Sequence, residues 1–218
     1  MSDIVDISSD GIIPLNWKNG FEKFKMMRIP VAGDGSCFFH CICKAFFIPY
    51  ITGIIDGSPI SKKQIVTSLR MDLSNALASK INNKSSMTHY DSLSRNELKN
   101  FSKNVPEYTL SAMQTRLNSD SSIGNEFNEF ISNQIAKDIY LLDNKKKDVY
   151  ITGDEDELLY KNRNSIVILY TEGHYELIGL MENNGHISTY FVHTHPFIQF
   201  IRQRTSIIKK QKINNTKI

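Results

Sequence analysis

Apolar residues recur at helical spacing in the first half of the chain and at strand-like spacing in the second half. The clearest stripe repeats every four residues and consists of Ile65, Leu69, Leu73, Leu77 and Ile81. This spacing predicts a helix over 61–81 with one face toward the core, and Ser61 is a suitable N-cap. Residues 37–47 are apolar on nearly every side, which indicates a buried helix that ends before Pro49.

Four further helices are predicted, at 16–28, 94–104, 108–118 and 122–137. The first is based on Trp17, Phe21 and Phe24, which recur at helical spacing. The last would begin at Ser122 as its cap. Residues 1–15 show no clear period, and we expect an irregular lead-in there.

The pattern changes after residue 138. Residues 139–142 and 149–151 indicate strands around a polar turn, and the unbroken apolar run at 166–170 is typical of a buried strand. Segments 174–180 and 187–192 predict a hairpin that turns at Asn183-Asn184-Gly185. A helical front half and a β-rich back half predict an α+β fold, with a small central β-sheet flanked by helices.

This organisation predicts one main domain at 29–201, preceded by a lead-in with a short helix at 1–28 and followed by a basic tail at 202–218. The net charge is only +3, but no acidic residue follows Glu182. We expect a solvated, frayed tail rather than a nucleic-acid contact, because beyond Phe200 no aromatic residue is interleaved with the basic ones. No apolar run is long enough to span a membrane, and the first residues lack a secretory pattern.

All three cysteines lie within seven residues, at Cys37, Cys41 and Cys43. This arrangement is not a disulfide framework, so we expect reduced thiols in a protein that is cytoplasmic and not secreted. Together with His40 the cysteines contain ligand-type groups, but on one helix these would point in different directions. We therefore expect no metal and no cofactor.

A candidate nucleophile lies at the predicted start of the helix at 37–47. Free N–H groups and the helix dipole stabilise a thiolate at a helix N-terminus, and Cys37 occupies that position. Gly33 and Gly35 allow the preceding loop to turn several backbone N–H groups toward one point, as an oxyanion hole requires. The same segment is also ordinary capping chemistry with an incidental cysteine, and it does not by itself decide between the two.

The base for such a nucleophile would be one of six histidines. His174 begins a predicted strand, where neighbours fix the imidazole and the edge leaves it accessible. Glu176 lies two residues further along and therefore on the same face of the strand, where a carboxylate could orient the imidazole. His193 and His195 share one face of another predicted strand end and are the alternative base.

Two segments together resemble one family. Asp34-Gly35-Ser36-Cys37-Phe38-Phe39-His40 resembles the nucleophile motif of OTU (ovarian tumour) cysteine peptidases, and Gly173-His174-Tyr175-Glu176-Leu177-Ile178 resembles their histidine motif. The resemblance covers about residues 30–180. The segments from Tyr150 to Asp154 and from Ile166 to Gly179 look most like OTU-type proteins of large DNA viruses, for which the host cytoplasm would be the location. A papain-like fold is what the resemblance implies.

The resemblance also implies an activity, which is deubiquitination: thiol-dependent hydrolysis after the C-terminal glycine of ubiquitin or a ubiquitin-like modifier. Ubiquitin or polyubiquitin chains would then be the partners. Cys37 would attack, His174 would be the base, and the backbone N–H groups of Asp34, Gly35 and Cys37 would bind the oxyanion. The third triad member would be either Glu176 or Asp34. A catalytically silent OTU-fold module that binds ubiquitin is the alternative.

Two sequence features are candidates for substrate binding. The densest acidic run of the chain includes Asp154, Glu155 and Asp156 and could receive the basic tail of ubiquitin, although a solvated turn is the simpler explanation. Tyr175 could line a narrow channel beside the site, and core packing explains this residue as well.

Overall fold

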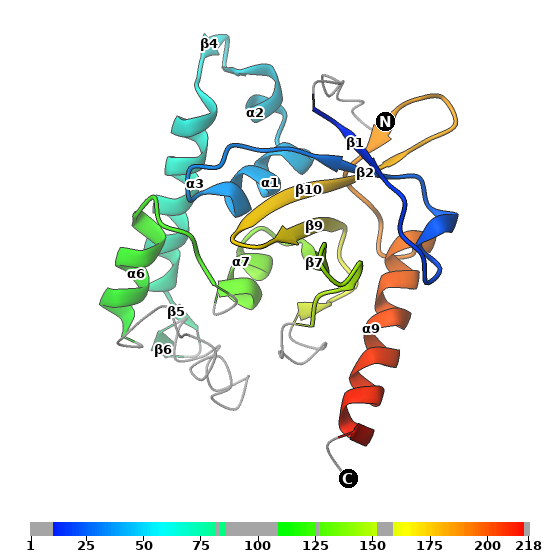
Figure 1. Ribbon diagram of the computed structural model, residues 1–218. Coiled ribbons are helices and arrows are strands. Elements are labelled where there is room, and N and C mark those ends of the chain that lie inside the picture. Colours follow the sequence, from blue (N-terminus) through cyan, green and yellow to red (C-terminus); the bar gives the residue numbers. More distant parts are fainter. Residues whose placement is uncertain (1–10, 82, 86–108, 125–126, 152–158, 216–218) are drawn as a thin grey trace.

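The computed structural model describes residues 11–81, 83–85, 109–124, 127–151 and 159–215. Its centre is a seven-stranded sheet in the order β1–β2–β10–β9–β7–β8, with β11 paired to the end of β10 (Figure 1). The strands are β1 (Ile13–Leu15), β2 (Met26–Ile29), β7 (Asp138–Asp143), β8 (Asp148–Val149), β9 (Ser165–Thr171), β10 (His174–Met181) and β11 (Ile187–Ser188). Neighbouring strands are antiparallel, except that β7 and β9 are parallel.

One face of the sheet is covered by a helical layer. α1 (Cys37–Phe46) packs on β9 and β10, α7 (Asn128–Gln134) packs on β7, and α3 (Lys62–Leu77) contacts both helices. α6 (Leu110–Asn118) lies on α3, and α2 (Ile48–Thr52) follows α1. The small hairpins β3–β4 (Ile54–Ile55 and Ser58–Pro59) and β5–β6 (Lys80–Ile81 and Lys84–Ser85) are separate from the main sheet.

The other face is covered by η1 (Phe21–Lys23) and by α9 (Pro196–Asn215). Phe197, Ile198 and Ile201 of α9 are buried in one cluster with Val167 and Leu169 of β9. Figure 1 shows α9 on the opposite side of the sheet from α3 and α6. The sheet therefore lies between two layers, which confirms the predicted α+β class with a central sheet flanked by helices.

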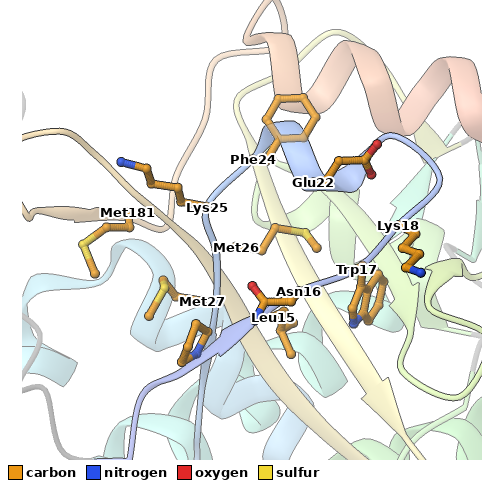
Figure 2. Close-up of a pocket in the computed structure, with 11 residues that line it drawn as sticks. Leu15, Asn16, Trp17, Lys18, Glu22, Phe24, Lys25, Met26, Met27 and Met181 are labelled. Atoms are coloured by element: carbon orange, nitrogen blue, oxygen red, sulfur yellow. The ribbon is translucent and has the colours of Figure 1, made fainter.

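A concave surface of the described residues lies beside β1, β2 and η1, where Trp17, Phe24, Met26 and Met181 are among the lining residues (Figure 2). None of the residues selected from the sequence as nucleophile, base or carboxylate lines it.

The two clearest helix predictions are confirmed. α1 begins at Cys37 and ends at Phe46, two residues before a proline-containing turn. The Ser61 hydroxyl accepts a hydrogen bond from the Gln64 N–H, and the Gln64 side chain accepts one from the Ser61 N–H, which forms a capping box at the start of α3. α3 ends at Leu77, four residues earlier than predicted, because Ile81 belongs to β5.

Strands β7 to β10 and the turn before β11 also match their predicted positions. α6 matches the helix predicted over 108–118, whereas α7 is shorter than the helix predicted over 122–137. The helix predicted over 94–104 lies outside the described residues.

The helix predicted over 16–28 is wrong. Gly20 adopts a positive φ of 93°, only the 3-10 turn η1 forms, and the chain then enters β2. Trp17 and Phe21 are buried as expected, but around this turn rather than along a helix. The predicted boundary between residues 28 and 29 falls inside β2.

The frayed tail predicted over 202–218 is also wrong for residues 202–215, which continue α9. The Arg204 guanidinium forms a two-pronged ion pair with Asp148 at the end of the sheet, with Nη2 to Oδ2 at 2.6 Å. Thr205 is buried as well. Within the described ranges, no helix is long and apolar enough to cross a membrane.

Candidate active site

Cys37 is the first residue of α1, and its side chain is buried. The sulfur therefore lies at a helix N-terminus, where the helix dipole favours negative charge, as the sequence indicates. In the loop before it, the Asp34 carboxylate accepts a hydrogen bond from the Ser36 N–H at 3.1 Å. That bond closes the loop into a tight turn directly before the nucleophile candidate.

The pKa of the Cys37 thiol is raised above its usual value. Burial is the largest cause, and the Asp34 carboxylate acts in the same direction. Hydrogen bonds from the backbone N–H groups of Tyr175, Phe38 and Cys37 oppose the increase without cancelling it. A raised pKa favours the protonated thiol, and a protonated thiol needs a base before it can attack a carbonyl carbon.

His174 is the first residue of β10, and about 30% of its side chain is exposed. A Cβ atom at Gly33 would lie 3.9 Å from His174 Cε1, so the imidazole packs against the loop that leads to Cys37. The Tyr175 N–H donates a hydrogen bond to the Cys37 sulfur, so the start of β10 also lies beside the sulfur. The structure thus brings together the two residues that the sequence selects as nucleophile and base.

Glu176 lies beside the imidazole, on the same face of β10. Its Oε1 atom is 3.9 Å from His174 Nε2, and only 6% of its side chain is exposed. The carboxylate is also held by Arg28 of β2, which donates from Nε to Oε2 and from Nη2 to Oε1, the latter at 3.0 Å. A carboxylate in this position can orient the imidazole and stabilise its charged form.

Asp34, the other candidate for the third triad position, faces a different histidine. Its Oδ2 atom is 3.0 Å from Nε2 of His40, whose Nδ1 atom is 2.7 Å from the Tyr50 hydroxyl. Burial raises the pKa of Asp34, but the hydrogen bonds from His40 and from the Ser36 N–H together lower it by more, so the pKa is below its usual value. The geometry therefore favours Glu176 over Asp34 as the partner of His174.

Arg70 of α3 is a buried part of the site that the sequence reasoning missed. It is only 2% exposed and donates to Ser36 Oγ at 2.9 Å, directly before Cys37. Its other hydrogen bonds go to the backbone carbonyls of Leu117, Arg116 and Ser121. The guanidinium also lies over the Phe39 ring, 4.5 Å from its centroid. Arg70 thus joins the start of α1 to the last turn of α6 and to the segment that follows it.

The remaining histidines have other environments. His195, one of the two alternative bases, precedes α9: its Nδ1 accepts from the Phe197 N–H at 3.2 Å, and burial lowers its pKa. His193 lies next to it, and its carbonyl accepts from Gln199 Nε2. His186 follows the hairpin turn, and His89 lies outside the described residues. No group of three potential metal ligands is present in the part of the chain that the structure describes.

Tyr175 contacts residues on both sides. Its ring packs on Phe38 at 5.2 Å and on Tyr170 at 5.5 Å between centroids, and Tyr150 continues the row beyond Tyr170. Tyr175 is therefore both a core-packing residue and a neighbour of the sulfur. The acidic residues Asp154, Glu155 and Asp156, named as candidates for substrate binding, lie outside the described residues.

No family model and no curated protein matches this sequence. A search of solved structures does find similar folds. An ovarian tumour (OTU) domain solved in complex with ubiquitin superposes with a TM-score of 0.52 at 18% identity, covering 92% of each chain. The viral OTU domain protease from Farallon virus matches at 17% identity and a TM-score of 0.42, covering 82% of this chain and 98% of its own. The chain therefore has the fold of an OTU domain.

Proposed function

We propose that this protein is a cysteine-type deubiquitinase, which hydrolyses the bond after the C-terminal glycine of ubiquitin or a ubiquitin-like modifier. The observation that carries the proposal is the arrangement of three residues in an OTU fold: Cys37 opens α1, and His174 and Glu176 lie on β10 beside the loop that precedes it. The solved OTU domain of similar fold that binds ubiquitin supports the choice of substrate.

In the first step, His174 accepts the proton of the Cys37 thiol as the sulfur attacks the carbonyl carbon. This order of events suits a thiol whose pKa is raised in the free protein. The backbone N–H groups of Asp34, Gly35 and Cys37 bind the oxyanion.

The intermediate then collapses with cleavage of the carbon–nitrogen bond. The His174 imidazolium gives its proton to the departing lysine amine, and a thioester joins Cys37 to the acyl part of the substrate. Water, deprotonated by His174, hydrolyses the thioester and releases the free carboxylate and the thiol. Glu176 holds the imidazole and stabilises its charged form in both steps.

The test uses ubiquitin with an electrophile at its C-terminus together with a cleavage assay on diubiquitin of all eight linkages. We expect the wild-type protein to be labelled, Cys37→Ala to be unlabelled, and His174→Ala to lose activity by about 100-fold or more. Labelling that persists in Cys37→Ala would overturn the assignment of the nucleophile. Loss of activity in His195→Ala but not in His174→Ala would overturn the assignment of the base.

A binding measurement separates the enzyme from a silent module. A wild-type protein that binds ubiquitin, but is not labelled by the electrophile and does not cleave diubiquitin, would contradict the proposal and support a module that only binds. Because Cys37→Ala removes a single buried sulfur atom, its melting curve provides the control for folding.

A further inference from the structure

We infer that Arg28 is a positioning residue of this site, which acts on His174 through Glu176. The inference rests on the proposed function and extends it to a residue on a different strand. It starts from the contact itself: the guanidinium binds both oxygens of the Glu176 carboxylate, and one of these oxygens also faces His174.

The pairing of the strands makes this contact possible. Arg28 on β2 lies opposite Ile178 on β10, and Glu176 is two residues from Ile178 on the same face. Side chains at such diagonal positions are within reach of each other when they are long. β2 leads into the loop that contains Asp34 and Gly35, while β10 carries His174. The ion pair therefore fastens the strand of the base to the strand that precedes the nucleophile loop.

A glutamate needs such a partner in this position. Its side chain has three rotatable bonds, and the carboxylate of Glu176 is only 6% exposed, so water cannot hold it in place. The planar fork of an arginine binds both oxygens of a carboxylate and fixes its plane. Without Arg28, the buried carboxylate would have to turn away, because a single imidazole at 3.9 Å is a weak partner.

The consequence for the imidazole concerns its tautomer. With Glu176 fixed and ionised, the proton of the neutral imidazole stays on Nε2, which faces the carboxylate. Nδ1 is then the basic nitrogen. The Arg28 side chain is 32% exposed and directs both of its hydrogen bonds to Glu176, so its effect on His174 passes through that carboxylate.

The experiment compares Arg28→Met with Arg204→Met. Arg204 is a matched control, because it forms the same kind of two-pronged pair with Asp148 at a similar exposure of 25%, at the contact of α9 with β8. For Arg28→Met we expect kcat on a ubiquitin substrate to fall by about 10- to 100-fold with KM nearly unchanged. Arg204→Met should keep the kcat of the wild type.

Two further variants test the route through Glu176. Arg28→Met combined with Glu176→Gln should be no slower than Glu176→Gln alone, because both changes remove the same effect. Arg28→Lys keeps the charge but not the fork, so its kcat should lie between those of the wild type and Arg28→Met. If Arg28→Met melts at a much lower temperature than Arg204→Met, Arg28→Lys replaces it as the test variant. A kcat of Arg28→Lys equal to that of the wild type would then overturn the inference.

The ¹⁵N chemical shifts of the His174 ring give a measurement that needs no activity. In the wild type they should show the proton on Nε2, and in Arg28→Met a mixture of both tautomers. Unchanged shifts together with an unchanged kcat would overturn the inference and leave the proposed function intact. An inactive wild type would instead overturn the proposed function, and the shifts would still decide whether Arg28 positions the imidazole.

Discussion

Gly35 and the backbone of Asp120 approach so closely that no side chain fits between them: a Cβ atom at position 35 would lie 2.0 Å from the Asp120 carbonyl oxygen. Gly35 also has a positive φ of 81°, which residues with a Cβ atom rarely adopt. The loop before Cys37 is therefore shaped by the segment after α6. The hydrogen bond from Arg70 to the Ser121 carbonyl holds the same segment in place.

Gly35→Ala should destabilise the protein by more than the ~1 kcal/mol that a positive φ alone costs an alanine. Gly185→Ala is the matched control, because Gly185 has a φ of 83° and a Cβ atom added there would meet nothing within 4 Å. Urea unfolding of both variants measures their losses of stability, and the additional loss in Gly35→Ala is due to the contact with Asp120. Equal losses of stability would show that the loop simply moves aside.

Arg70→Met should destabilise the protein by about 3 kcal/mol, because it removes the donors from one buried and two partly buried carbonyl groups and leaves the Ser36 hydroxyl without its partner. Ser36→Ala removes only one of the acceptors of Arg70, and we expect a loss of about 1 kcal/mol. Urea denaturation of the two variants provides the comparison. The assigned role of Arg70 would be refuted by an Arg70→Met protein that is as stable as Ser36→Ala.

The stability of the protein should depend on pH through Asp34. The pKa of this group is lower in the folded protein than its usual value of 3.8, so the ionised carboxylate stabilises the folded state. This contribution is fully present above pH 3.8 and is lost as the pH falls through the folded pKa. The wild type should be more stable than Asp34→Asn at about pH 6, and the difference should shrink at about pH 3. Unfolding curves that differ equally at both pH values would contradict this.

The free thiol of Cys37 should react slowly with iodoacetamide at about pH 7, and its alkylation rate should rise only above about pH 9, because burial raises its pKa. Cys41 and Cys43 should react even more slowly, since both are buried and the pKa of Cys43 is raised to about 12. Peptide mapping after timed alkylation measures all three. A rate for Cys37 that already levels off below about pH 7 would instead indicate a thiolate–imidazolium pair in the resting protein.

The sequence predicts those parts of the fold that depend on local chemistry. The capping box at Ser61, the start of α1 at Cys37 and the apolar run of β9 are all encoded within a few residues, and each is found at its expected place. The sequence alone predicts that His174 and Glu176 lie side by side, because alternate residues of a strand share a face.

The missed features depend on distant partners. Arg70 is next to an apolar stripe in the sequence, but its carbonyl acceptors lie 46 to 51 residues further along the chain. Arg28 and Glu176 are separated by 148 residues. The helix predicted over 16–28 is wrong for a related reason: aromatic residues at helical spacing can also pack around a 3-10 turn. The turn here begins after Gly20, and it buries Trp17 and Phe21 and partly buries Phe24.

The place of β2 in the sheet has a consequence for the newly made chain. Among the described strands, β2 lies between the three-residue β1 and the long β10. A two-stranded ribbon is only marginally stable in water, so β2 gains a firm neighbour only after residues 174–181 have left the ribosome. The strand that leads into the loop with Asp34 and Gly35 is thus fixed late, although it is synthesised early. A nascent chain or a fragment that stops before β10 would have the thiol but no assembled site.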